Sequence, residues 1–72
     1  MGIGDRVKVK DGATKWMKGK GYWLECFGDN IDGHVGEIIN DYTDLPCDDS
    51  HYEVNLGFDY GVGINPQWLE LV

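Results

Sequence analysis

The chain has 72 residues, 42% of them hydrophobic, and a formal net charge of −7. This length allows one domain at most, and no apolar run reaches the ~20 residues that a membrane-spanning helix needs. Residues 1–20 hold all six basic residues and two acids, for a net +4, whereas residues 21–72 hold eleven acids and no Lys or Arg, for −11. The acidic excess disfavours general DNA or RNA binding, because phosphate attraction requires a basic surface, and it would instead steer basic partners.

The first predicted strand covers residues 4–10, where Val7 and Val9 alternate with charged side chains. Such alternation is typical of a strand with one buried face. Asp11 and Gly12 form a dipeptide that predicts a turn directly after this strand.

Residues 13–33 are predicted to form a long first loop. Gly19 and Gly21 argue against a helix through Trp16–Trp23, because glycine weakens a helix interior. Within the loop, residues 22–27 (YWLECF) have the composition of a strand. The loop also holds more aromatic side chains than a turn requires.

The second predicted barrel strand covers residues 34–40, and its Gly36 indicates a bulge or a close backbone approach. Residues 41–50 then read as an acidic loop, which Pro46 interrupts. No repeat, linker or low-complexity segment follows, so residues 1–72 are interpreted as a single domain.

The strongest pattern is a run of apolar residues at every second position, formed by Tyr52, Val54, Leu56, Phe58, Tyr60, Val62 and Ile64. The run is too long for one ordinary strand, so it predicts a hairpin with its turn near residues 57–60. Residues 65–68 then resemble a single helical turn that begins with Pro66. Residues 69–72 form the last predicted strand.

This order of elements resembles the SH3-like barrel superfamily. The segments that carry the resemblance are residues 4–9 (GDRVKV), 33–38 (GHVGEI), 52–54 (YEV) and 68–71 (WLEL). The resemblance implies an all-β fold, a small five-stranded SH3-like barrel with a long first loop and a single helical turn before the last strand. The residues expected to form the barrel core are Val7, Val9, Val35, Ile38, Val54, Leu56, Val62, Ile64, Leu69 and Leu71.

Within that superfamily, the chain resembles the variable chain of ferredoxin–thioredoxin reductase and the extrinsic SH3-like subunit of photosystem I. Both are small subunits without catalytic residues that dock on a larger redox partner. The resemblance therefore implies a non-catalytic protein-binding subunit or adaptor. KOW-type ribosomal and transcription modules share the opening strand, which implies a nucleic-acid-binding module as a weaker alternative. The ALYDY-type motif of signalling SH3 domains is missing, which disfavours ordinary recognition of Pro-rich peptides.

The residues predicted to bind a partner are Trp16, Tyr22, Trp23, Trp68, Asp44, Asp48 and Asp49. In an SH3-like barrel the first loop lies beside the turn before the last strand, so the aromatic residues of both would line a groove. Trp and Tyr are the usual interface anchors, and the acids would steer a larger protein with a basic surface. Alternatively, the same aromatic residues fold back as a lid over a small core.

No constellation of residues points to catalysis, a metal or a cofactor. Cys47 and His51 lie four residues apart, but nothing supplies an oxyanion hole or an orienting third group. No C-x-x-C or H-x-x-x-H spacing suggests zinc. Because no secretory segment is visible, we expect a cytoplasmic protein in which Cys26 and Cys47 are reduced.

A second hypothesis for function starts from the same acidic segment. The domain would then be an acidic decoy, a nucleic-acid mimic of the kind that some phages encode, which blocks a basic surface on a partner. The two hypotheses differ in the surface that carries the binding energy. An adaptor depends on its aromatic groove, whereas a decoy depends on carboxylates and loses affinity steeply with salt.

Overall fold

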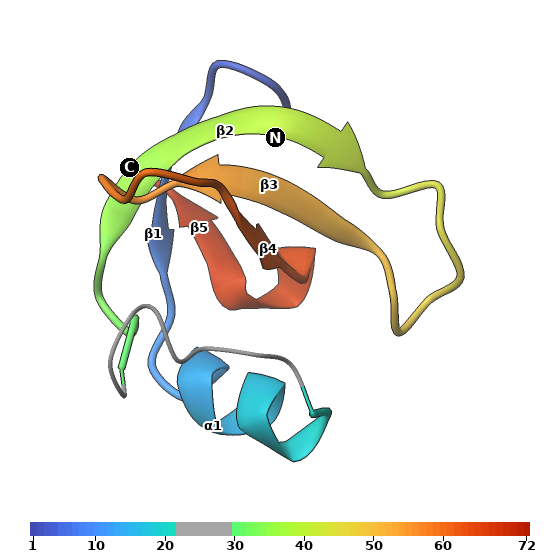
Figure 1. Cartoon of the computed structure of the whole chain (residues 1–72). Coiled ribbons are helices and arrows are strands. Elements are labelled where there is room, and N and C mark those ends of the chain that lie inside the picture. The colour runs from blue at the N-terminus through green and yellow to red at the C-terminus, as the bar shows by residue number, and fades with distance from the viewer. Residues whose placement is uncertain (22–29) are drawn as a thin grey trace.

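The computed structural model describes residues 1–21 and 30–72 (Figure 1). The elements in this part of the chain are β1 (Arg6–Val9), α1 (Ala13–Gly19), β2 (Val35–Tyr42), β3 (His51–Asn55), β4 (Val62–Ile64), a 3-10 turn (Pro66–Trp68) and β5 (Leu69–Leu71). The predicted small, mainly β domain is confirmed. So are the hairpin of β3 and β4 and the single helical turn before the last strand.

The five strands form one antiparallel sheet in the order β4-β3-β2-β1-β5. Figure 1 shows β2 and β3 curving strongly, with α1 at one end of the sheet. The predicted closure into a barrel is wrong, because no ladder joins β4 to β5 in the described residues. Each of these edge strands has only three residues, and the 3-10 turn occupies most of the chain between them.

Two irregularities in β2 produce its curvature. A side chain at Gly36 would collide with the carbonyl oxygen of Asn55, so the predicted close backbone approach is confirmed. The bulge lies further along, where the pairing register shifts between Ile38 and Asn40 and leaves Ile39 as the extra residue. Ile38, just before the bulge, points inward and is fully buried, while Ile39 is 37% exposed.

The core lies on the concave side of the sheet, and eight of the ten predicted core residues are buried there. The prediction is wrong for Val35 and Leu71, which are both exposed. Val35 pairs with Lys8, an outward-facing position of β1, so it lies on the convex face. Leu71 pairs with the inward-facing Val7, but it ends the short edge strand β5 and nothing in the described chain covers it fully.

Apart from Tyr52 of β3, the rest of the core comes from the segment predicted as a long loop. Ala13 and Met17 of α1, and Ile31 after it, are buried in the core cluster. A loop over residues 13–19 is therefore the wrong prediction, because this stretch is helical. Gly19 and Gly21, whose low helix propensity predicts no helix from Trp16 onward, instead lie at the C-terminal end of the helix, where Gly19 is the last helical residue and Gly21 adopts a left-handed φ of 81°. The strand suggested over residues 22–27 lies outside the described residues.

The connection between β1 and β2, residues 10–34, contains α1 and returns to the end of β1. We call this connection the excursion. Val9 N–H donates to the carbonyl of His34 (2.8 Å), and Gly33 N–H donates to the carbonyl of Val9 (2.8 Å). These two bonds close the base of the excursion against the end of β1. No helix within residues 1–21 and 30–72 is long and apolar enough to cross a membrane.

Candidate functional site

Two of the predicted binding residues meet at one end of the sheet. The ring centroids of Trp16, in α1, and Trp68, in the 3-10 turn, are 6.2 Å apart with their planes tilted by 49°. The predicted proximity of the first loop to the turn before the last strand is thereby confirmed. Both side chains are half-buried and pack against the core cluster. The pair therefore covers part of the core while presenting aromatic surface to solvent.

Local sequence determines where Trp68 lies. The Asn65 side chain caps the 3-10 turn by accepting a hydrogen bond from Gln67 N–H (3.1 Å), and Pro66 supplies the helical φ. The carbonyl of Trp68 accepts a hydrogen bond from Lys10 N–H (2.8 Å). Its ring lies against Gly12, where a side chain would come within 3.1 Å of Cζ3. Glycine at this position therefore lets the indole cover the start of α1.

Among the described residues, the indole nitrogen of Trp68 is the one buried side-chain nitrogen or oxygen without a hydrogen-bond partner. Its Nε1 atom is buried, and no acceptor lies within hydrogen-bonding distance in residues 1–21 and 30–72. A buried indole N–H ordinarily has a partner, because losing water without replacement costs about 1–3 kcal/mol.

The helix that carries Trp16 is held by a carboxylate from the far end of the excursion. Asp32 Oδ2 accepts a hydrogen bond from Gly12 N–H (2.8 Å). Asp32 Oδ1 accepts from the Thr14 N–H (2.9 Å) and hydroxyl (2.8 Å). The Thr14 hydroxyl oxygen also accepts from Ile31 N–H (2.9 Å). Asp32 thus acts as the N-terminal cap of α1, a role that the residue preceding the helix does not fill.

Burial acts to raise the pKa of the Asp32 carboxyl, but the hydrogen bonds from Gly12 and Thr14 act in the opposite direction and outweigh it. The net effect lowers the pKa below its ordinary value. A carboxyl whose pKa is lower in the folded state stabilises the fold above its unfolded pKa, near 4, and loses this contribution as the pH falls through the folded pKa.

We therefore expect Asp32→Asn to make the free energy of unfolding depend less on pH at acidic pH. At neutral pH it should cost about 1 kcal/mol, as for loss of a helix cap, because the amide cannot accept from all three donors. Below about pH 4 the difference from wild type should shrink, since the wild-type carboxyl is then becoming protonated. Urea unfolding at several pH values measures both effects. Asp59→Asn, at an exposed loop carboxyl, controls for the loss of one charge, and an unchanged gap at low pH would contradict the assignment.

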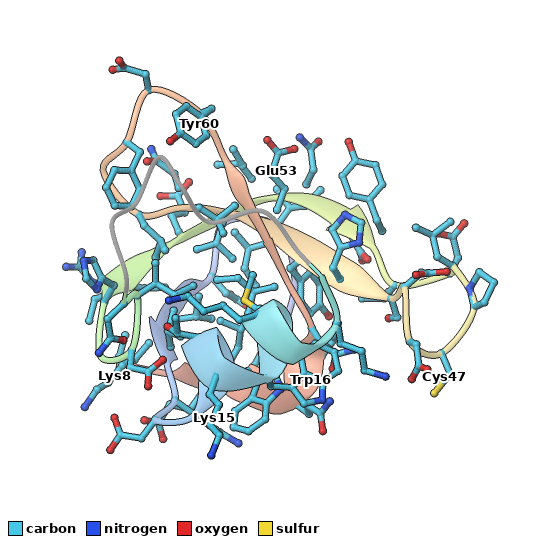
Figure 2. All side chains as sticks on the ribbon, turned by 60° about the horizontal axis from the view of Figure 1, so that its bottom comes forward. Lys8, Lys15, Trp16, Cys47, Glu53 and Tyr60 are labelled. Carbon is cyan, nitrogen blue, oxygen red and sulfur yellow. The ribbon has the colours of Figure 1, made fainter. Side chains whose placement is uncertain are left out.

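The predicted acids lie in the exposed loop between β2 and β3. Asp44, Asp48 and Asp49 are all exposed, and the carbonyl of Pro46 accepts hydrogen bonds from the N–H groups of Asp49 (2.7 Å) and Ser50 (3.0 Å). Figure 2 shows Cys47 at the outer tip of this loop. The loop therefore presents its carboxylates to solvent on a backbone that is held by a local turn.

The acidic loop begins with a second ordered carboxylate. Thr43 donates from its hydroxyl (2.7 Å) and its N–H (2.9 Å) to Asp41 Oδ1. These bonds lower the pKa of the Asp41 carboxyl, the hydroxyl contributing most. The far end of the loop is joined to the 3-10 turn by a hydrogen bond from Asn65 Nδ2 to the carbonyl of Ser50 (3.1 Å). The loop is consequently anchored beside Trp68.

A lysine of the first excursion joins the acidic loop to the aromatic pair. Lys20 Nζ lies 3.4 Å from Asp48 Oδ2 and 5.5 Å from the centroid of the Trp16 ring. We call the surface formed by Trp16, Lys20, Asp48 and Trp68 the tryptophan face. It unites residues from α1 and its C-terminal end, the acidic loop and the 3-10 turn.

The remaining predicted site residues divide into two groups. Asp44 and Asp49 share the acidic loop with Asp48, but they do not belong to the tryptophan face. Tyr22 and Trp23 lie outside the described residues, as does Cys26. Sequence reasoning missed Lys20 and Asp32. Lys20 follows Trp16 by four residues, the spacing of neighbours on a helix face, so predicting the helix would have revealed their contact.

The other reactive side chains show no further site. Cys47 is a free, exposed thiol. His51 Nδ1 lies 2.8 Å from the carbonyl oxygen of Asp49, and its ring centroid is 5.0 Å from that of Tyr42. No group of three or more His, Cys, Asp or Glu residues within the described ranges is arranged to hold a metal ion.

Comparison with known proteins gives this chain no relative from which a role could be transferred. No protein-family model matches it, and no curated protein or solved structure matches it significantly. Its function must therefore be inferred from the geometry of the chain itself.

Proposed function

We propose that the domain is a non-catalytic protein-binding subunit or adaptor that docks a larger partner through the tryptophan face. The observation that carries the proposal is the Trp16–Trp68 pair, half-buried and joined to the acidic loop by Lys20. Rigid aromatic anchors of this kind supply much of the binding energy at protein interfaces.

The arrangement of strands supports an SH3-like fold as the framework of this site. β1 pairs with both β2 and β5, and a 3-10 turn immediately precedes β5. We propose an open form of the SH3-like barrel, in which no ladder joins β4 to β5 within the described residues. Such a framework suits the proposed role as a cytoplasmic docking module without a catalytic centre of its own.

The acidic loop supplies the second component of the proposed interface. Exposed carboxylates contribute little to the final binding energy, but they accelerate the approach of a basic partner. Asp44, Asp48 and Asp49 are exposed on a loop that the Asn65–Ser50 bond holds beside the aromatic pair. Their place next to the tryptophan face suits steering toward that face.

Once a partner has been identified with the tagged domain as bait and purified, Trp16→Ala should weaken binding by more than about 1 kcal/mol, roughly fivefold or more. Calorimetric titration measures the affinity. Tyr60→Ala is the matched control, because Tyr60 is an exposed aromatic residue that lies on the opposite side of the molecule in Figure 2. Asp48→Asn combined with Asp49→Asn should mainly slow association, which stopped-flow mixing at two salt concentrations detects.

The exposed acidic loop also favours one alternative, the decoy that imitates nucleic acid. That function predicts the opposite pattern, in which Trp16→Ala binds normally and the double Asp variant abolishes binding. A partner that releases nucleic acid when the domain is added would support the decoy. Specific binding of nucleic acid by the domain itself at physiological salt would contradict both functions and favour a KOW-like module.

A further inference from the structure

Lys20 occupies a position on the tryptophan face that is built to hold a cation. We propose that this position receives a Lys or Arg side chain of the partner, and that Lys20 is an internal surrogate which the partner displaces. The inference rests on the proposed docking function and adds the chemistry of the docked segment, which is basic. It also adds a regulatory role for Lys20, because the free domain occupies its own site.

The geometry around Lys20 Nζ defines the cation position. One side is the face of the Trp16 ring, 5.5 Å away at its centroid, and another is the Asp48 carboxylate, at 3.4 Å. An aromatic face together with a carboxylate is a favourable environment for an ammonium or guanidinium group. Arginine suits it best, because its planar group stacks on indole and bonds a carboxylate at two points.

Lys20 is held weakly enough to be replaced. Its side chain is 40% exposed, and that of Asp48 is 76% exposed. Exposed ion pairs and exposed cation–π contacts are individually weak, because water screens them. The same site becomes stronger when a partner covers it and excludes water. A docked basic residue therefore gains more from the site than Lys20 does in the free domain.

The test uses a hexa-arginine peptide as the probe and a hexa-citrulline peptide as its uncharged counterpart. Lys20→Met keeps an unbranched apolar side chain and removes the competing cation. The matched control is Lys15→Met, which changes the net charge equally at an exposed position of α1. Calorimetry should show that Lys20→Met binds hexa-arginine about three- to tenfold more tightly than Lys15→Met does, as expected when a weak internal competitor is removed.

Nuclear magnetic resonance locates the binding. In Lys20→Met, hexa-arginine should shift the indole N–H signal of Trp16, whereas hexa-citrulline should not. Asp48→Asn should abolish this shift, while Asp59→Asn, which removes an equal charge from the exposed loop between β3 and β4, should leave it intact. Circular dichroism verifies that each variant is folded.

If Lys20→Met and Lys15→Met raise the affinity for hexa-arginine equally, the proposal that Lys20 is a surrogate is wrong, because net charge alone would then explain the effect. Weaker binding by Lys20→Met would also overturn it. If hexa-arginine never reaches Trp16 but the purified partner still depends on Trp16, the docking function stands and only the basic chemistry fails. If neither ligand depends on Trp16, the docking function itself is wrong.

Discussion

Gly36→Ala is expected to destabilise the domain by about 3 kcal/mol or more, the upper end of the cost of overpacking. A β-carbon at this position would collide with the Asn55 carbonyl oxygen and lie 2.9 Å from Leu56 Cδ2. The obstacle is largely backbone, which cannot move without disturbing the pairing of β2 with β3. A domain of this size has a total stability of about 4–10 kcal/mol, so the variant should lose a third or more of it.

Urea unfolding, followed by circular dichroism, measures this loss. Gly19→Ala is the matched control, because a β-carbon added there would meet no atom within 4 Å and Gly19 ends α1 without a left-handed φ. That change should leave stability unaltered or raise it by up to about 1 kcal/mol, through better helix propensity. A stable Gly36→Ala variant would show that β2 and the chain after β3 do not approach this closely.

Ile38→Ala should be the second most damaging change, at about 2–5 kcal/mol, because it leaves a cavity at a fully buried position of a central strand. Ile39→Ala should cost less than about 1 kcal/mol, because adjacent residues of a strand face opposite sides of the sheet and Ile39 is 37% exposed. The two substitutions remove the same atoms from adjacent residues. Their difference therefore reports which of the two side chains faces the core.

Denaturant midpoints of the two Ile variants provide the measurement. If they lose stability equally, the assignment of Ile38 to the buried face and of Ile39 to the exposed face is wrong. If Ile39→Ala is the more damaging change, β2 turns its opposite face to the core.

The parts of the fold that follow from local patterns were predictable. The period-two run from Tyr52 to Ile64 predicts a hairpin, and its inward residues Val54 and Val62 pair directly. Asn65 and Pro66 likewise predict the 3-10 turn, because one caps it and the other supplies the required φ. In both cases a few neighbouring residues contain the whole signal.

The parts that depend on distant residues were not predictable. Where the bulge in β2 falls depends on the pairing with β3, which residues 34–40 alone do not show. Val35 is a different case, because it lies three residues from Ile38, so alternation itself places the two on opposite faces and the prediction that both belong to the core is wrong.

The cap of α1 comes from Asp32, 20 residues beyond Gly12. The helix segment contains helix formers such as Ala13 and Met17, but Gly12 at its N-terminal end offers no capping side chain and Gly19 disfavours a helix. The candidate site could not be predicted for the same reason, because its Lys20–Asp48 contact joins residues that are 28 positions apart in the sequence.

The closed base of the excursion between β1 and β2 makes its length independent of the sheet. Val9 bonds to both Gly33 and His34, so the strands on either side still meet when residues are added to the connecting chain, provided that its core residues Ala13, Met17 and Ile31 are kept. In chain-entropy terms, doubling the length of such a loop costs only about 0.6 kcal/mol. This connection is therefore where natural variation or protein engineering can insert new sequence, and with it new specificity, while the sheet is preserved.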